Sequence, residues 1–153
     1  MFFSFAQVVF QECPNEVSLA LSISGCPLKC VGCHSAFTWN PTYGEELTEN
    51  KFLSFIEKYR GLITCVVFYG GEWEIDTLKK YLDISLSNEL KTCLYTGLEY
   101  QDFELSFLKS VTYLKTGKYV QKLGGLNSAT TNQKFYKLSD GKIIDDLTNS
   151  FIN

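Results

Sequence analysis

Short apolar runs separated by polar turns dominate the sequence and predict a series of β-strands. In residues 17–23 the larger apolar side chains fall at every second position, which is the period of a strand with one strongly apolar face. Residues 63–69 form a continuous apolar and β-branched run, as in a strand that is covered on both faces in a parallel sheet. Further strands are expected around 6–11, at 92–95 and at 111–114.

Helical patterns lie between these strands. Thr48 can cap a helix that ends at Gly61, because the apolar residues between them fall on one face: Phe52, Leu53, Phe55, Ile56 and Tyr59. A second helix is expected near 75–82 and a short one near 102–109. Because strands and helices alternate, we expect right-handed βαβ crossovers in an α/β protein, with an open parallel sheet or a partial (β/α) barrel.

The C-terminal part departs from this alternation. Two short apolar runs, 135–138 and 142–144, flank Ser139-Asp140-Gly141, where Asp-Gly favours a tight β-hairpin. No internal repeat and no linker rich in Pro, Gly or Ser divides the chain. We therefore predict a single domain over residues 1–153, with a small C-terminal β-hairpin.

Composition narrows the possible functions. The 153 residues are 45% hydrophobic and 20% charged, so the chain can bury a core without disulfides. A net charge of −3 with scattered lysines gives no basic stripe, and nucleic acid is not an expected partner. The apolar N-terminus lacks the features of an export signal, and polar residues interrupt it well short of membrane-spanning length. We expect a cytoplasmic protein that does not contact a membrane.

One loop concentrates the potential metal ligands. The stretch CPLKCVGCH, which follows the strand at 17–23, contains Cys26, Cys30, Cys33 and the single histidine, His34. In a reducing cytosol such thiols are more often metal-bound or catalytic than paired. Three thiolates on a cubane iron–sulfur cluster would leave one iron open to another ligand. Zinc is an alternative, because His34 could complete a Cys3His set, although the side chains of the adjacent residues Cys33 and His34 diverge. A chance cluster of cysteines that binds no metal is a further alternative.

A second motif, Gly70-Gly71-Glu72, follows the strand at 63–69 in the same way. Ligands of open α/β sheets bind beyond the carboxyl ends of the strands, so both motifs belong at one edge. The glycines allow a ligand to approach the backbone, and Glu72 offers a carboxylate to a cationic amine. A helix-opening turn with an acidic residue near the positive end of the helix dipole explains the same residues.

These motifs resemble those of the radical S-adenosylmethionine (SAM) enzymes, which carry C-x3-C-x2-C after the first strand and a GGE-like motif after the second. More narrowly, the chain is similar to the anaerobic ribonucleoside-triphosphate reductase activating proteins, which are glycyl-radical enzyme activases. The stretches that carry this similarity are CPLKCVGCHSAFTW (26–39), YGGEWE (69–74), LYTG (94–97) and the TNQ-containing run 114–138. The resemblance implies a fold of the radical SAM type.

The resemblance also implies cofactors and ligands. Cys26, Cys30 and Cys33 would ligate three irons of a [4Fe-4S] cluster, and the fourth iron would chelate SAM. One electron from the cluster would split SAM into methionine and a 5'-deoxyadenosyl radical. That radical would abstract a hydrogen atom from a glycine in the large subunit of an anaerobic ribonucleoside-triphosphate reductase. The implied partners are this glycyl-radical protein and an external low-potential electron donor.

Binding of SAM is implied for residues after two further strands. Gly70, Gly71 and Glu72 would hold the methionine end, with Glu72 facing the ammonium group. Thr96, with the adjacent Gly97, would line the SAM pocket, unless these two residues form a plain strand-to-helix turn.

One position departs from the wider family. Many radical SAM enzymes carry an aromatic residue just before the third cysteine, where this chain has Gly32, as is common among the reductase activating proteins. Phe37 or Trp39 could cover the adenine instead, although ordinary core packing explains both. Residues 127–133 could dock the glycine-bearing segment or form a self-satisfied polar loop.

The remaining cysteines are Cys13, Cys65 and Cys93, and we expect them to be free thiols, with Cys65 and Cys93 buried as small hydrophobes. Two other functions stay open at this point. One is a small radical SAM enzyme that acts on a free metabolite, similar to 7-carboxy-7-deazaguanine synthase. The other is a non-catalytic binding module that holds zinc or an iron–sulfur cluster.

Overall fold

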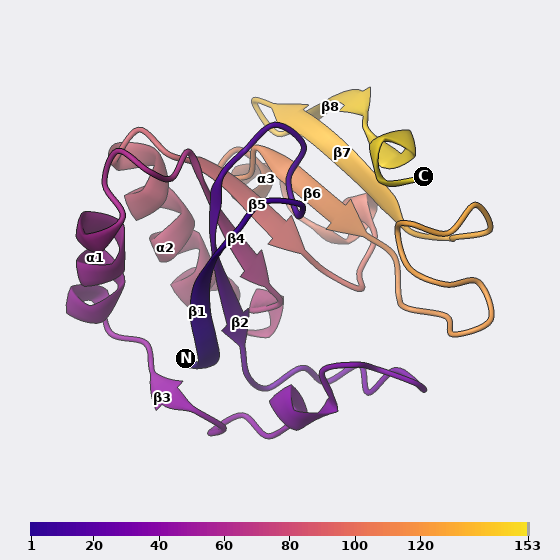
Figure 1. Ribbon diagram of the computed structural model, residues 1–153, viewed down its shortest axis with the longest axis horizontal. Helices are drawn as coiled ribbons and strands as arrows, with labels where there is room; N and C mark the ends of the chain where they lie inside the picture. Colours follow the sequence, from indigo (N-terminus) through magenta and orange to yellow (C-terminus); the bar gives the residue numbers. More distant parts are fainter. Residues whose placement is uncertain (153) are drawn as a thin grey trace.

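An eight-stranded sheet forms the centre of the computed structural model, which describes residues 1–152 (Figure 1). The predicted domain ends at Asn153, which lies outside the described residues. The strand order is β3-β1-β2-β4-β5-β6-β7-β8. The strands are β1 (Phe2–Val9), β2 (Ser18–Ile23), β3 (Glu45–Glu46), β4 (Cys65–Tyr69), β5 (Lys91–Tyr95), β6 (Tyr113–Thr116), β7 (Lys134–Ser139) and β8 (Lys142–Asp146).

The sheet is mixed, and the prediction of an open parallel sheet or a partial (β/α) barrel of the radical SAM type is wrong. Only β2, β4, β5 and β6 run parallel to one another. All other neighbouring pairs are antiparallel. Antiparallel neighbours need only short connections, whereas parallel neighbours need a crossover. The short connection after β1 and the turn at Asp140-Gly141 provide two of the four antiparallel pairs, and the second of these is the predicted C-terminal hairpin of β7 and β8. The prediction extended the βαβ direction to the rest of the sheet, where β1 and β3 and also β6 and β7 pair antiparallel.

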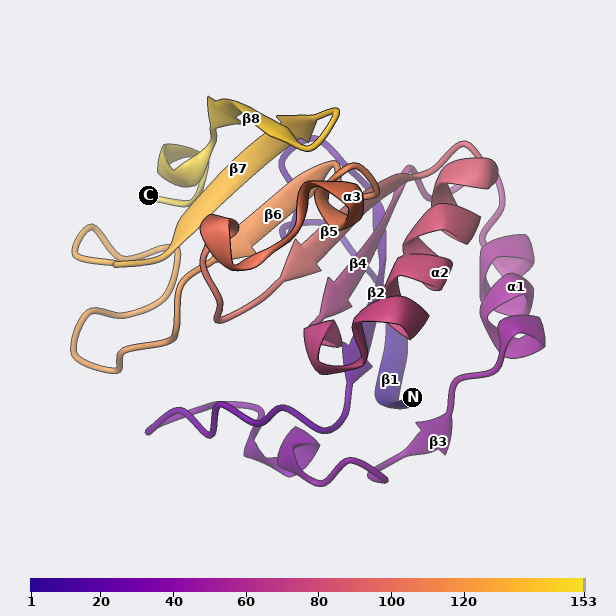
Figure 2. The ribbon, with the colours of Figure 1, turned by 180° about the vertical axis from the view of Figure 1, so that it is seen from behind.

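Three helices cover one face of the sheet (Figure 2). They are α1 (Glu49–Lys58), α2 (Ile75–Ser87) and α3 (Leu105–Leu108). The predicted start of α1 is confirmed, because the Thr48 side chain accepts a hydrogen bond of 3.2 Å from the backbone N–H of Lys51. The helix ends earlier than predicted, at Lys58 with Tyr59 as its C-cap, and Gly61, with a positive φ of 80°, lies in the turn that follows. α2 is longer than predicted and α3 shorter.

Residues 1–152 also contain four 3₁₀ helices, three in connections and one after β8, namely η1 (Ala36–Trp39), η2 (Glu72–Glu74), η3 (Tyr100–Asp102) and η4 (Thr148–Phe151). No helix among residues 1–152 is long and apolar enough to cross a lipid bilayer.

Both faces of the sheet are packed. The helix-covered face holds the larger core, around the fully buried side chains of Phe52, Phe68 and Leu82. The opposite face holds a smaller core that contains Cys13, Cys65 and Cys93. All three thiols are free and buried, which confirms their predicted state.

A buried carboxylate ties the amino-terminal ends of the parallel strands together. Glu16, in the connection between β1 and β2, accepts hydrogen bonds of 2.6 Å from Thr64 Oγ1 and 2.8 Å from the Tyr113 hydroxyl. Lys91 forms an ion pair with the same carboxylate. Burial alone would raise the pKa of Glu16, but these three donors lower it below its ordinary value. This end of β4, β5 and β6 is therefore cross-linked through one side chain.

Candidate functional site

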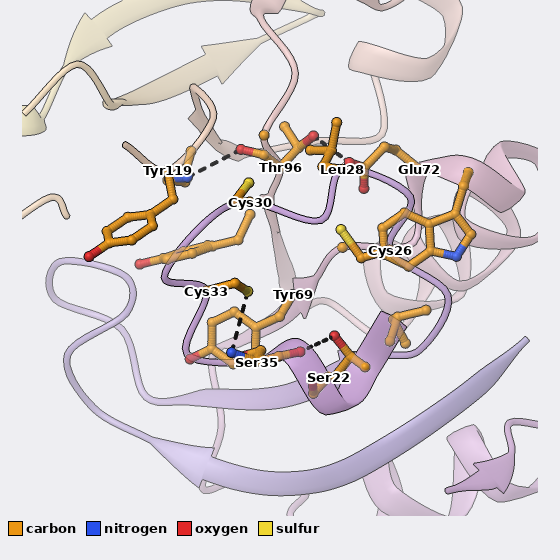
Figure 3. A pocket seen from close by; sticks show the side chains of 17 residues that line it. Ser22, Cys26, Leu28, Cys30, Cys33, Ser35, Tyr69, Glu72, Thr96 and Tyr119 are labelled. Carbon is orange, nitrogen blue, oxygen red and sulfur yellow. Dashed lines mark hydrogen bonds between the residues drawn. The ribbon is translucent and has the colours of Figure 1, made fainter. Parts of the chain in front are cut away.

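A cavity of about 220 Å³ lies beyond the carboxyl ends of the parallel strands, where the cysteine loop follows β2 and Gly70 follows β4 (Figure 3). Six of the seven predicted site residues line it, namely Cys26, Cys30, Cys33, Gly70, Glu72 and Thr96. The exception is Gly71, which faces the core, because a Cβ there would lie 3.4 Å from the Leu78 side chain and 3.5 Å from that of Ile23.

Backbone hydrogen bonds hold the cysteine loop in place. The N–H groups of Gly25 and Cys26 donate to the Thr38 carbonyl at 2.6 and 3.3 Å. The Cys33 N–H donates to the Cys30 carbonyl at 3.1 Å, which closes a tight turn. Figure 3 shows the three thiols around the cavity wall, and Cys30 is the most buried of them.

The environment of the thiols suits ligation of a positive centre. Burial raises the pKa of the Cys26 thiol, and the nearby Glu72 carboxylate raises it further. A positive metal centre would offset both effects, since metals bind the thiolate. The N–H of Ser35 donates to Cys33 Sγ at 3.4 Å, and hydrogen bonds to ligand sulfurs tune the potential of an iron–sulfur cluster.

The side chains of the described residues do not form a site for a single metal ion. Within residues 1–152, no three His, Cys, Asp or Glu side chains converge closely enough to hold one metal ion. The thiols of Cys26, Cys30 and Cys33 are instead spread around a common cavity. That arrangement fits a multi-iron centre, in which each thiolate binds a different iron. His34 is exposed and does not line the cavity.

Glu72 presents a buried oxygen to the cavity without a partner. Thr96 Oγ1 donates a hydrogen bond of 2.7 Å to Glu72 Oε1. The other oxygen, Oε2, is buried and has no hydrogen-bond partner among residues 1–152. Burial raises the pKa of Glu72, and the Thr96 hydrogen bond and the Lys115 charge offset part of that shift. A buried carboxylate oxygen without a donor is unfavourable, so this atom fits a ligand that brings a cationic donor.

Gly70 allows an aromatic side chain to close one side of the cavity. Its φ is +79°, and a Cβ at this position would lie 2.3 Å from the Trp73 ring. The indole N–H of Trp73 donates to the Ser24 carbonyl at 3.1 Å, which fixes the ring. A larger residue at position 70 would therefore displace a wall of the site.

Lys115 is a site residue that the sequence reasoning missed. It lies in β6, is only 9% exposed, and lines the cavity. Its Nζ donates to the carbonyl oxygens of Gly117 at 2.9 Å and Thr96 at 3.3 Å. Burial lowers its pKa to about 8. No signal in the sequence marked it, because Lys115 lies one residue beyond the predicted strand 111–114 and is followed by Thr116, Gly117 and Lys118. Together with Glu72, it gives the cavity one basic and one acidic buried group, which complements the two charges of an α-amino acid.

Four aromatic residues line the cavity, namely Tyr69, Trp73, Tyr95 and Tyr119. Neither of the two predicted candidates, Phe37 and Trp39, is among them. The Phe37 ring is 44% exposed and packs against Tyr43, at 5.6 Å between ring centroids. Tyr69 and Tyr95 are the last residues of β4 and β5, Trp73 lies in η2, and Tyr119 lies in the loop after β6.

A second cavity of about 450 Å³ adjoins the first and shares Tyr69, Tyr95 and Lys115 with it. Asn127 and Gln133, the two ends of the predicted docking segment, line this second cavity. Gln133 Nε2 also donates to the Gly117 carbonyl at 3.2 Å, so part of the segment satisfies its own turn.

The chain belongs to the 4Fe-4S single cluster domain family, whose model matches residues 16–148. It is similar to the anaerobic ribonucleoside-triphosphate reductase-activating protein of Enterobacteria phage T4, with 29% identity over 136 residues, which cover 80% of this chain and 85% of that protein. No solved structure matches the chain significantly. The resemblance inferred from the motifs is thereby confirmed.

Proposed function

We propose that this protein is a radical SAM activase that generates a glycyl radical on an anaerobic ribonucleoside-triphosphate reductase. One observation carries the proposal, namely that three thiols and the unpartnered carboxylate oxygen of Glu72 face the same cavity. The family supports the [4Fe-4S] cluster, and the name of the phage T4 relative supports the partner.

The cysteine loop holds the cluster. Cys26, Cys30 and Cys33 ligate three irons, which leaves one iron for SAM. A reduced cluster held by these residues would supply the electron that splits SAM into methionine and a 5'-deoxyadenosyl radical. Because the cofactors provide this chemistry, the chain needs no acid–base pair, and its residues position the ligands and exclude water.

The methionine end of SAM binds between the two buried charged groups. Glu72 Oε2 accepts a hydrogen bond from the ammonium group, while Thr96 holds the other carboxylate oxygen in place. Lys115 faces the carboxylate of the same ligand. The backbone at Gly70, which lines the cavity, allows the ligand to approach closely because it carries no side chain, whereas Gly71 faces the core.

The second cavity receives the glycine-bearing segment of the reductase. It adjoins the cavity that the three thiols line, and Tyr69, Tyr95 and Lys115 line both cavities and separate them. The side-chain amides of Asn127 and Gln133 can bond to an extended peptide backbone. A glycine can lie next to Tyr69 and Tyr95, because it has no side chain that would collide with the two rings.

The electron donor docks on the cysteine loop, which is the outer wall of the cavity and exposes 82% of Val31. Residues 25–44 and 117–133 carry Lys29, Lys118 and Lys122 and no aspartate or glutamate, although the chain has 17 acidic residues. A donor with an acidic face complements this rim.

The test begins with the anaerobically purified protein, its iron and sulfide content, and its SAM cleavage under dithionite. The activase is then incubated with the candidate reductase, SAM and reductant, and the glycyl radical is sought by electron paramagnetic resonance. We expect cleavage and a glycyl signal that requires all components. Zinc without sulfide, or an intact cluster that never yields 5'-deoxyadenosine, would refute the proposal and favour a binding module. SAM cleavage without a glycyl signal would favour a free metabolite as substrate.

A further inference from the structure

The cofactor cavity has two chemically different sides. Figure 3 shows Glu72 and Cys26 on one side and Tyr119 on the other, with Cys30 and Cys33 nearer to Tyr119. A ligand that places a cationic amine at Glu72 therefore extends its remaining part toward Tyr119. For SAM, that remaining part is the nucleoside.

Three of the four aromatic side chains that line the cavity are held by contacts with other parts of the protein. Trp73 is fixed by its hydrogen bond to Ser24 and by its contact with Gly70. The Tyr95 hydroxyl donates to the Glu12 carbonyl at 2.6 Å, which turns it toward the second cavity. Tyr69 packs edge-on against Tyr95, at 5.2 Å between ring centroids.

Tyr119 differs from these three because its aromatic neighbour is the exposed ring of His34, 5.7 Å away between centroids. It comes from the loop after β6, and it is half-buried where it lines the cavity. One face of a half-buried tyrosine on a cavity wall is a platform on which a flat base can stack.

Gly32 lies against the segment that carries this tyrosine. A Cβ at Gly32 would lie 2.9 Å from Cδ of Gln121, two residues after Tyr119. Gly32 also has a φ of +74°, a conformation that other residues rarely adopt. This contact and the contact between the Tyr119 and His34 rings show that residues 119–121 lie against the cysteine loop.

We propose that Tyr119 forms the adenine-binding wall of the cavity lined by the three thiols. This inference rests on the proposed function, because it assigns the base end of SAM. Tyr119 then determines specificity, because it favours a sulfonium compound that carries a nucleoside over one that lacks the base.

The test compares two ligands that differ by the base alone. S-adenosylhomocysteine and S-ribosylhomocysteine are titrated calorimetrically into the cluster-loaded protein under anaerobic conditions. We expect the wild type to prefer S-adenosylhomocysteine, and Tyr119→Ala to reduce that preference about tenfold, in line with base–aromatic stacking. Tyr119→Phe should retain the preference, and so should the control Tyr43→Ala, which removes a tyrosine outside the cavity. Iron content and unfolding temperature report whether each variant is folded.

An unchanged ratio of the two dissociation constants in Tyr119→Ala overturns the inference, including a parallel weakening of both ligands, which marks a purely structural role. The proposed function survives that outcome, since the wild type still binds S-adenosylhomocysteine. A folded, cluster-loaded wild type that binds neither ligand overturns both.

Discussion

Thr96 Oγ1 donates a hydrogen bond of 2.7 Å to one oxygen of Glu72 and leaves the other oxygen buried, with no partner among residues 1–152. The two residues come from different connections, one after β4 and one after β5, whose parallel strands end at the same edge of the sheet. The sheet thus holds a carboxylate in a fixed orientation with one acceptor directed at the cavity.

Glu72→Gln should weaken SAM binding about tenfold or more, because a neutral amide replaces a charge-assisted acceptor, and such bonds contribute about 1.5–3 kcal/mol. Iron content should be unchanged. Calorimetric titration of SAM into the cluster-loaded protein measures the effect, with the exposed Glu45→Gln as the control. Equal affinity of Glu72→Gln and wild type would contradict the assigned role.

Cys30→Ala should abolish both the cluster and SAM cleavage, whereas Cys65→Ala should spare them. Both thiols are buried, but Cys65 belongs to the core on the face opposite the helices. Cys65→Ala should cost only about 1 kcal/mol of folding free energy, as a small core truncation. Iron and sulfide per chain, absorbance and urea unfolding report the difference. Equal cluster loss in the two variants would show that the ligands are misassigned.

Lys115 should give the cluster-free protein a characteristic dependence of stability on pH. Its pKa is about 8 in the fold against 10.5 for the free side chain, so the unfolded chain binds more protons between these values. Stability attributable to this residue therefore rises with pH through that window, by about 1–3 kcal/mol, and below pH 8 the buried charge imposes its full cost.

Lys115→Met removes this titration. The difference in unfolding free energy between Lys115→Met and wild type should favour the variant at pH 7 and shrink toward pH 10 in urea titrations. A difference that does not change with pH would mean that Lys115 is not desolvated. Lys134→Met, at an exposed position of β7, serves as the control.

Gly70→Ala should be much more destabilising than Gly61→Ala. Both glycines have a φ near +80°, so both substitutions introduce backbone strain of about 1 kcal/mol or more. A Cβ at Gly61 meets nothing within 4 Å, whereas one at Gly70 meets the Trp73 ring at 2.3 Å. Thermal unfolding should show an additional cost of about 1–3 kcal/mol for Gly70→Ala. Equal costs would show that Trp73 moves freely.

Local signals in the sequence account for the parts of the site that were predicted. Thr48 caps α1 through a bond that spans three residues, and the cysteine spacing is set within one loop. The ends of β2 and β4 could be read from the apolar runs that precede Cys26 and Gly70. Each of these features depends on neighbours in the chain, which periodicity and turn chemistry describe.

The features that were missed depend on contacts between distant segments. Apolar periodicity carries no information about strand direction, so the antiparallel pairing of β1 with β2 and of β7 with β6 could not be read from it. The β7–β8 hairpin was predicted, because Asp140-Gly141 is a local turn signal, whereas the two-residue β3 has no apolar run. Tyr119 lies in a loop without any period, and its place in the cavity wall depends on how that loop packs against the cysteine loop. Lys115 is one lysine among the 14 basic residues, and only its burial distinguishes it.

The carboxylate of Glu16 gives the two ends of the parallel strands different mechanical properties. At that end Thr64, Lys91 and Tyr113 are all anchored to one carboxylate. At the other end the loops are joined only in pairs, by the hydrogen bond between Thr96 and Glu72 and by those of Lys115. Thermal motion should therefore be smallest beside Glu16 and larger in these loops. If SAM binds as proposed, its cleavage products would leave by movements of the loops, while the paired strands beneath them stay in place.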